Sequence, residues 1–296
     1  MPGLSVEAKR VAQTVAYGIH GRRRAGPGET FWQFRHYGAG DSAPMIDWRR
    51  SASSSHLYVR EREWEAAHTF WLWVDLSPSM LFGSHLSPCL KVERALVLAL
   101  ATAELLVSAG ERVGVPGLMA PTAQRTAMQT MAVALAGAGL AKGEQHSVPP
   151  RLPFRRFSAL ILFSDFLEPL DTLRGVIDYY TGLGMRGHLL QILDPAEETL
   201  PYSGRIEFSA MEGGARVLTE RAEAVRQKFQ QRMSAHRDNL RQMIQRREWS
   251  FGLHHTDRPA GDALLALHSG LAGFSAPRGE KQHRDGLGAR ALDGES

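Results

Sequence analysis

An apolar stretch that ends in an acidic turn is the feature that most constrains the fold of this chain. Residues Thr69–Val74 (TFWLWV) predict a buried strand that ends at Asp75. The turn that follows carries Ser77 and Ser79. A carboxylate followed by two hydroxyls, two and four residues later, gathers several oxygen atoms at the carboxyl end of a strand. In α/β folds, ligands bind at this edge of the sheet.

A second apolar run ends in the same way. Ser158–Ser164 (SALILFS) predicts a continuously buried, parallel strand, and Asp165 follows it directly. A long apolar helix is expected between the two strands, over Lys91–Val107. Alternating strands and helices predict an α/β fold: a doubly wound, mostly parallel sheet with helices on both faces. If the two strands are neighbours at the switch point of the sheet, Asp75 and Asp165 face each other across one crevice.

The remaining elements of the α/β region are expected from apolar periodicity and from turn residues. Helices are predicted over Leu4–Ile19, Thr126–Leu135, Leu170–Leu183, Glu220–Arg247 and Ala263–Leu271. Strands are predicted over Arg112–Leu118, His188–Leu193 and Trp249–His254, with a short hairpin within Glu197–Leu218. The stretch Ala136–Arg156, which holds several Gly and Pro residues, is expected to be a loop.

Composition divides the chain into three parts. Residues 1–65 are expected to hold an N-terminal helix and a small lobe rich in Arg, Asp and aromatic residues. Residues 66–272 are expected to form the α/β domain. Residues 273–296 contain almost no large apolar side chains, so a disordered tail is predicted there.

Two interpretations concern the small lobe. Its density of Arg, Asp and aromatic residues suggests charge-assisted hydrogen bonds. The expected pairs join Arg35 and Arg49 to Asp41 or Asp47, and the alternative is that these residues form a binding surface. Leu57–Glu65 (LYVREREWE) alternates apolar and charged residues, which predicts a half-exposed strand beside the Thr69–Asp75 strand.

The overall composition excludes several classes of protein. Of 296 residues, 43% are apolar and 22% are charged, as is typical of a soluble globular protein. The net charge of +4 is mild and the Arg residues are dispersed, so no nucleic-acid partner is expected. The single cysteine, Cys89, excludes an intramolecular disulfide and a multi-cysteine zinc site. The chain shows neither an apolar signal peptide nor about 18 consecutive apolar residues, so we expect a cytoplasmic protein that does not insert into membranes.

Common enzyme motifs are missing from the sequence. It contains no GxSxG elbow, no P-loop, no GxGxxG after a strand and no HExxH. A phosphate-transferring aspartate of the haloacid-dehalogenase type would need a second Asp two residues after Asp75, where Ser77 stands. The sequence therefore gives no support to these classes of enzyme.

The D-x-S-x-S segment resembles part of a known metal site. Asp75, Ser77 and Ser79 match the first segment of the metal-ion-dependent adhesion site (MIDAS) of von Willebrand factor A domains. Asp165 matches the last acidic residue of that site. Carboxylate and hydroxyl oxygens suit Mg²⁺. The two carboxylates neutralise the ion mostly through water, and the hydroxyls ligate it directly without adding charge. The ion therefore stays electrophilic, and it would bind one more carboxylate from a partner protein.

Two points remain open for this metal site. MIDAS also needs a Thr from the loop before the third helix, and Thr126 is the candidate here, with Thr122 a poorer one. Thr126 serves equally well as a helix cap at capping-box spacing from Gln129. In the competing interpretation no ion binds: Ser77 and Ser79 cap the turn, and Asp75 accepts hydrogen bonds from backbone amides.

The wider chain, from about Gly26 to Leu271, resembles the bacterial DUF58 family. The segments that carry the resemblance are FRHYGAGDSAPMIDW (Phe34–Trp48), YVREREWE (Tyr58–Glu65), WVDLSPSM (Trp73–Met80), GERVG (Gly110–Gly114), DPAE (Asp194–Glu197) and LPYSGR (Leu200–Arg205). Members of that family are similar to von Willebrand factor A proteins and are associated with MoxR-type AAA+ ATPases. The resemblance implies a non-catalytic partner of such an ATPase, acting in the assembly or maturation of other proteins.

Three functions are therefore compatible with the sequence. The first is a protein-interaction module in which an ion held by Asp75, Ser77, Ser79 and Asp165 captures a carboxylate of the partner. The second is a metal-dependent hydrolase that uses Asp75 and Asp165 to hold an activating ion, although no obvious base accompanies them. The third is a scaffold that binds no ion.

Overall fold

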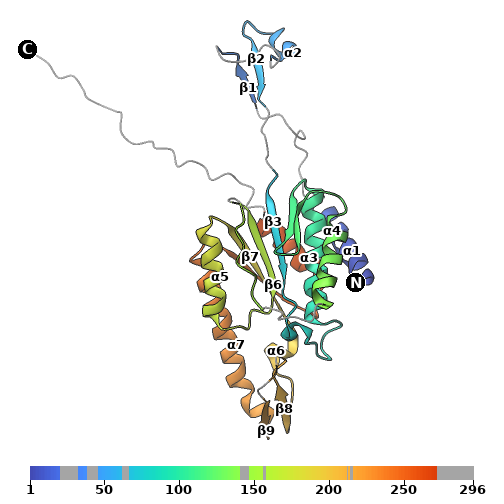
Figure 1. Cartoon of the computed structure of the whole chain (residues 1–296), viewed down its shortest axis with the longest axis vertical. Coiled ribbons are helices and arrows are strands. Elements are labelled where there is room, and N and C mark those ends of the chain that lie inside the picture. Colours follow the sequence, from blue (N-terminus) through green and yellow to red (C-terminus); the bar gives the residue numbers. More distant parts are fainter. Residues whose placement is uncertain are drawn as a thin grey trace, which may run out of the picture.

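The computed structural model describes residues 1–20, 33–38, 46–61, 67–140, 147–155, 158–211, 213 and 216–271. The tail predicted to be disordered, 273–296, lies outside these residues. The described chain consists of a central sheet covered by helices, a small lobe and a projecting hairpin (Figure 1).

The central sheet has the strand order of a doubly wound fold. In spatial order its strands are β10 (Ser250–His255), β7 (Arg186–Leu193), β6 (Ala159–Ser164), β3 (Thr69–Val74), β4 (Arg112–Val115) and β5 (Met119–Thr122). All neighbours are parallel except β4 and β5. Numbered along the chain, this is the order 3-2-1-4-5-6, whose switch point lies between β3 and β6. The predicted fold class is confirmed.

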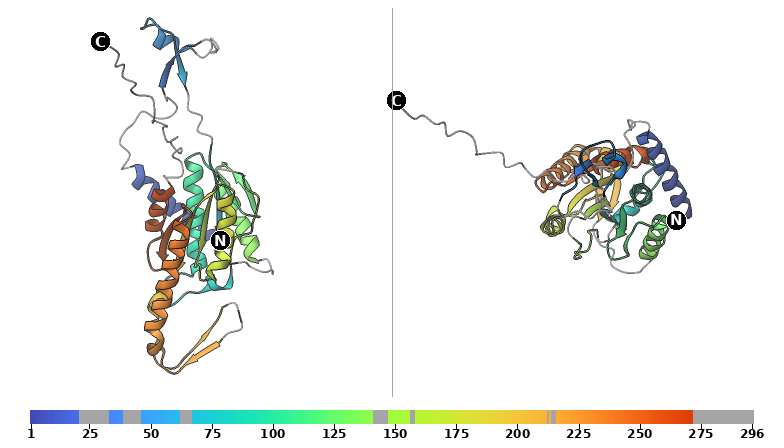
Figure 2. Two further views of the ribbon diagram at one scale, coloured as in Figure 1. Left: turned by 90° about the vertical axis from the view of Figure 1, so that its left-hand side faces the viewer. Right: turned by 90° about the horizontal axis from the view of Figure 1, so that it is seen from above.

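Helices cover both faces of this sheet (Figures 1 and 2). One apolar core joins the sheet to α1 (Pro2–His20), α3 (Lys91–Ser108), α4 (Ala127–Leu140) and α8 (Ala260–Leu271). The other core joins it to α5 (Leu170–Gly182) and α7 (Ala222–Gln245). Alternation along β3 supplies both cores, because Phe70, Leu72 and Val74 face the first and Trp73 faces the second.

The N-terminal helix belongs to the α/β body, whereas we expected it to group with the lobe. Ala8, Ala12 and Val15 of α1 are buried in the core shared with α3 and α8. Because α3 is covered by the sheet on one side and by α1 on the other, most of its residues are buried.

The expectation that the strand of the small lobe lies beside β3 was wrong. Strand β2 (Tyr58–Glu61) of the lobe pairs antiparallel with β1 (Gln33–His36), not with β3. Short helix α2 (Trp48–Ser51) is capped by Asp47, whose Oδ1 accepts the backbone N–H of Arg50 at 2.9 Å. The predicted pairing of Arg35 with Asp41 lies outside the described side chains.

Three further elements differ from the sequence-based expectation. The chain turns back at Pro116–Gly117, where Gly117 has a φ of +73°, and forms the edge strand β5 instead of continuing one strand to Leu118. Helix α4 runs to Leu140, through a stretch expected to be a loop. A short helix, α6 (Pro195–Thr199), follows β7. The predicted hairpin is present as β8 (Ile206–Ser209) and β9 (Arg216–Thr219).

In the part of the chain that the structure describes, every helix is too short or too polar to span a lipid bilayer.

Candidate functional site

Asp75 lies at the carboxyl end of β3 and is completely buried. Its Oδ1 accepts the backbone N–H of Ser77 at 2.8 Å, and its Oδ2 accepts the hydroxyl of Ser164 at 2.6 Å. Burial raises the pKa of Asp75 above its ordinary value of 3.8, although the two serine donors oppose the shift. The turn-stabilising role considered for Asp75 is thus present in the structure.

The two hydroxyls of the D-x-S-x-S segment lie side by side. Ser77 precedes a short 3₁₀ helix, η2 (Pro78–Leu81), which carries Ser79. The Oγ atoms of Ser77 and Ser79 are 3.1 Å apart and share a hydrogen bond. Ser77 is buried, but Ser79 is partly exposed, so its side chain is accessible from outside the protein.

Asp165 ends β6, the neighbour of β3, so the two predicted acidic residues do meet at one edge of the sheet. Its Oδ1 accepts the N–H of Leu167 at 3.2 Å, and its carbonyl accepts Nε2 of Gln191 at 2.8 Å. The next residue, Phe166, has a φ of +49°, which is uncommon for a bulky side chain. The N–H of Phe166 donates to Oγ of Ser164 at 3.1 Å, and this bond helps to hold the strained turn.

Lys91 is the first residue of α3 and brings a buried positive charge to this edge. Its Nζ donates to Oδ2 of Asp165 at 2.8 Å and to Oε1 of Glu197 at 2.6 Å. Burial alone would lower the pKa of Lys91, but the charges of the two carboxylates outweigh it and raise this pKa above 10.5. The ammonium group is therefore charged at neutral pH.

Helix α6 positions the second carboxylate. Asp194 caps this helix, because its Oδ1 accepts the N–H of Ala196 at 2.8 Å. In turn, Oε2 of Glu197 accepts the N–H of Asp194 at 2.9 Å, which completes a capping box. Asp194 also accepts the hydroxyl and the N–H of Ser84, at 2.6 and 2.8 Å. This network ties the end of β7 to the loop between η2 and α3.

Thr126 is not part of the site. Strand β5 runs antiparallel to β4 and ends at Thr122, which pairs with Val113 near the start of β4. Thr126 follows four residues later and lies at the amino-terminal edge of the sheet, opposite to Asp75. Thr122 lies toward the same edge. The chain reverses direction at Gly117, and this reversal carries both threonines away from the acidic residues.

The Mg²⁺ prediction stays a prediction, but the donor set does not suit a divalent ion. One oxygen of Asp165 is bound to the Lys91 ammonium, and both oxygens of Asp75 accept hydrogen bonds from serines. An ion beside Ser77 and Asp165 would be repelled by the charge of Lys91. Among the residues that the structure describes, no cluster of three or more His, Cys, Asp or Glu is arranged to hold a metal.

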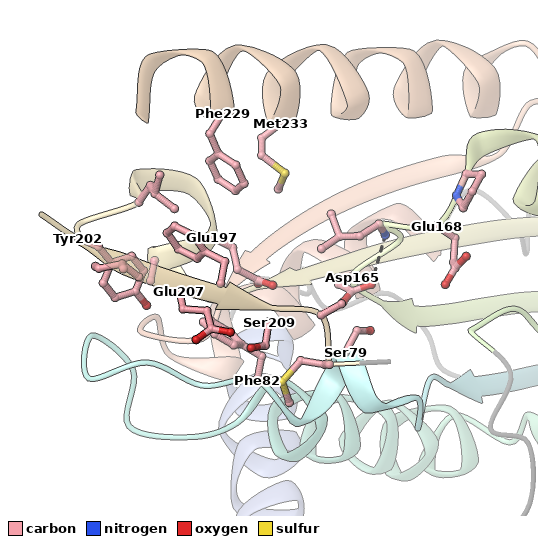
Figure 3. Close-up of a pocket in the computed structure, with 18 residues that line it drawn as sticks. Ser79, Phe82, Asp165, Glu168, Glu197, Tyr202, Glu207, Ser209, Phe229 and Met233 are labelled. Carbon is pink, nitrogen blue, oxygen red and sulfur yellow. Dashed lines mark hydrogen bonds between the residues drawn. The ribbon is translucent and has the colours of Figure 1, made fainter. Parts of the chain in front are cut away.

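A groove of about 850 Å³ opens beside this cluster (Figure 3). Ser79 and Asp165 lie at its floor, the β8–β9 hairpin forms one wall, and α7 lies across from the hairpin. Phe229 and Met233 point from α7 toward the groove. The large apolar side chains that line it are Phe82, Leu167, Leu200, Tyr202, Ile206, Phe208, Met211, Phe229 and Met233.

The sequence interpretation missed Lys91, Ser164 and Glu197. A signal existed for two of them. A lysine at the first position of an apolar helix is unfavourable, because the positive end of the helix dipole lies there. The segment Asp194–Glu197 (DPAE) has the spacing of a capping box, which predicts α6. No local pattern marks Ser164 as a partner of Asp75.

Comparison with known protein families shows to which family this chain belongs. Residues 33–239, more than half of the chain, match the family described as "Protein of unknown function DUF58". This protein belongs to the DUF58 family. An uncharacterized protein of Mycobacterium bovis is 28% identical over 256 residues, which cover 81% of this chain and 79% of that protein. An uncharacterized protein of Mycobacterium tuberculosis H37Rv matches to the same extent.

Solved structures with which this DUF58 protein was compared are distant. A conserved hypothetical protein, BatB, from Bacteroides thetaiotaomicron is 15% identical, with a TM-score of 0.38 over 70% of this chain and 100% of that chain. The SpRpn10 VWA domain is 9% identical, with a TM-score of 0.32 over 68% of this chain and 95% of that chain. The description of the fold therefore rests on the strand order and the helix layers of this protein itself.

Proposed function

We propose that this DUF58 protein is a non-enzymatic protein-interaction module that binds a segment of a partner protein in the groove. The observation that carries this proposal is the position of the groove. It lies outside the carboxyl ends of β3 and β6, at the switch point where doubly wound sheets bind ligands. Its lining combines apolar and aromatic side chains with a small polar floor, as in the cores of protein interfaces.

Helix α7 supports a protein as the ligand. Between Ala222 and Leu240 the helix has no buried residue, yet Phe229 and Met233 stand one turn apart on the side that lines the groove. An apolar stripe of this kind is a surface that a partner segment covers. Met and Phe side chains are enriched at such interfaces, and Met adapts its shape to different ligands.

The charges at the groove select the segment. Glu168 and Glu207 carry negative charge at its rim, and none of its described lining residues is basic. Glu207 also has Arg216 of β9 at 3.5 Å, an exposed ion pair that neutralises it only in part. We propose that the bound segment carries apolar side chains and at least one Lys or Arg. Family resemblance suggests that the partner is a MoxR-type AAA+ ATPase, whose remodelling cycle would act on the complex during assembly or maturation of other proteins.

The form in which an ion captures a partner's carboxylate is less favoured, because Lys91 already neutralises Asp165. A hydrolase that uses Asp75 and Asp165 would be supported by turnover of a phosphatase or peptidase substrate. That turnover should disappear in both Asp75→Asn and Asp165→Asn.

The test measures binding of the full-length protein to a purified MoxR-type ATPase from the same genome. We expect the double variant Phe229→Ala/Met233→Ala to weaken binding by about tenfold or more. The control is Val133→Ala on α4, an apolar residue that is 73% exposed and does not line the groove. Undiminished binding by the double variant would refute the groove, and no binding by the wild type would refute the ATPase as partner.

A further inference from the structure

The ammonium group of Lys91 lies between the carboxyl end of β6 and the short helix α6. It is completely buried, and it bridges Asp165 at the end of β6 and Glu197 in α6. Among the described residues, no other basic side chain lies within 4.0 Å of either carboxylate. One fixed positive charge therefore serves two negative charges at the floor of the groove.

This position is unfavourable for a lysine on two counts. Removing an ammonium group from water is costly unless it is paired and hydrogen-bonded. The N-terminus of a helix also carries a partial positive charge, which repels a cation in its first turn. The two carboxylates offset most of these costs, and the Phe82 ring, whose centroid lies 5.8 Å from Nζ, adds a cation–π contact. The charge of Lys91 is therefore a required part of this cluster.

We infer that Lys91 supplies the cation of the Asp75–Asp165 crevice, in place of a divalent metal ion, and that this protein binds its partner without metal. The ammonium group holds Asp165 as a bound ion would, and it links β6, α3 and α6. This inference concerns the site itself and does not depend on which partner binds in the groove.

The hydroxyl pair then has a different role from metal ligation. Ser77 and Ser79 share a hydrogen bond with each other, and Ser79 reaches the floor of the groove. Without an ion, the Ser79 hydroxyl acts as a neutral donor or acceptor for a backbone or side-chain group of the bound segment.

The experiment is a titration of the full-length protein with Mn²⁺ and with Mg²⁺. Calorimetry and thermal unfolding would be followed up to about 10 mM, roughly ten times the Kd of weak carboxylate sites. For the wild type we expect no saturable binding that depends on Asp165 and no change in Tm. Saturable binding that is abolished by Asp165→Asn would overturn the inference, whereas binding that survives this substitution lies elsewhere and leaves it supported.

Removal of the lysine gives the reciprocal test. Lys91→Ala vacates the place of the ammonium group and leaves Asp165 and Glu197 unneutralised. We expect this variant to gain Mn²⁺ binding, and its Tm to rise by about 2–4 °C in the metal. Lys228→Ala, at an exposed position of α7, is the control and should gain nothing. A folded Lys91→Ala that binds no metal would contradict the inference, and if that variant does not fold, the wild-type titration decides.

Discussion

Ser164 donates a hydrogen bond of 2.6 Å to Oδ2 of Asp75 and so joins the ends of β6 and β3. The same hydroxyl accepts the backbone N–H of Phe166 at 3.1 Å. Asp75 and the turn that positions Asp165 therefore depend on one buried serine. Through its hydrogen bonds with Ser77 and Ser164, the carboxylate of Asp75 connects the turn after β3 to the end of β6, whether or not a ligand binds there.

Removing the acceptor at Asp75 should destabilise the protein, whereas removing only its charge should not. In Asp75→Ala, the N–H of Ser77 and the hydroxyl of Ser164 lose their partner, and we expect a loss of about 1–3 kcal/mol in the free energy of unfolding. In Asp75→Asn, an acceptor for Ser77 remains, and a change below about 1 kcal/mol is expected. Urea unfolding at pH 7 measures both. Equal losses in the two variants would contradict this role.

The charge of Asp75 should appear in the pH dependence of stability. Burial raises its pKa above 3.8, so the folded protein keeps this proton to a higher pH than the unfolded chain does. Stability from this group is present below 3.8 and is lost as the pH rises through the folded-state pKa. The free energy of unfolding of the wild type, relative to Asp75→Asn, should therefore fall as the pH increases from 4. A constant difference would show that the pKa is not raised.

Loss of the Lys91 ammonium should be among the most damaging single changes at this edge. Lys91→Met keeps most of the side-chain volume but leaves Asp165 and Glu197 buried without a counter-charge. We expect a loss of about 3–5 kcal/mol in the free energy of unfolding at pH 7. Lys228→Met on the exposed face of α7 is the matched control and should change stability by less than about 0.5 kcal/mol. A small effect at Lys91 would mean that the two carboxylates are solvated.

The sequence was sufficient to predict a mostly parallel, doubly wound sheet, without its edge strand β5, and the meeting of Asp75 with Asp165. Both residues end uninterrupted apolar runs, and parallel strands in a doubly wound sheet place their carboxyl ends at one edge. The apolar run and the Asp that follows it are neighbours in the sequence, so each strand end can be predicted from a short segment.

The partners of these residues could not be predicted in the same way. Lys91 and Glu197 are 106 residues apart, and their contact depends on how α3 and α6 are oriented on the sheet. Thr126 was misplaced for a related reason. Whether the segment after Val115 runs parallel or antiparallel depends on the turn at Gly117, and apolar alternation does not encode strand direction.

Close packing at the amino-terminal end of β7 gives a prediction about Gly187. A Cβ atom added at Gly187 on β7 would overlap the indole of Trp249, which is buried in the second core. We expect Gly187→Ala to cost about 1–3 kcal/mol in the free energy of unfolding. Gly137→Ala in α4 is the control, because the space there is open and alanine inside a helix is favoured over glycine by about 0.5–1 kcal/mol. Thermal unfolding should show shifts of opposite sign, and a neutral Gly187→Ala would mean that Trp249 can move.

His188 should make the protein acid-sensitive. Its Nδ1 lies 2.7 Å from Oγ of Ser250, and burial lowers its pKa from 6.5 to about 4. The unfolded chain therefore binds a proton at a higher pH than the folded protein, so stability from this group is complete above 6.5 and is lost as the pH falls toward 4. The shift corresponds to about 3 kcal/mol at most.

Two measurements check the state of His188. In NMR spectra, its ring signal should show a neutral imidazole at pH 5, with the assignment made by comparison with His188→Gln. The same variant cannot take up this proton, so its free energy of unfolding should fall less steeply than that of the wild type between pH 6.5 and pH 4. A His188 signal that titrates near 6.5, or equal slopes in the two proteins, would show that the ring is hydrated and that its burial does not control the acid stability.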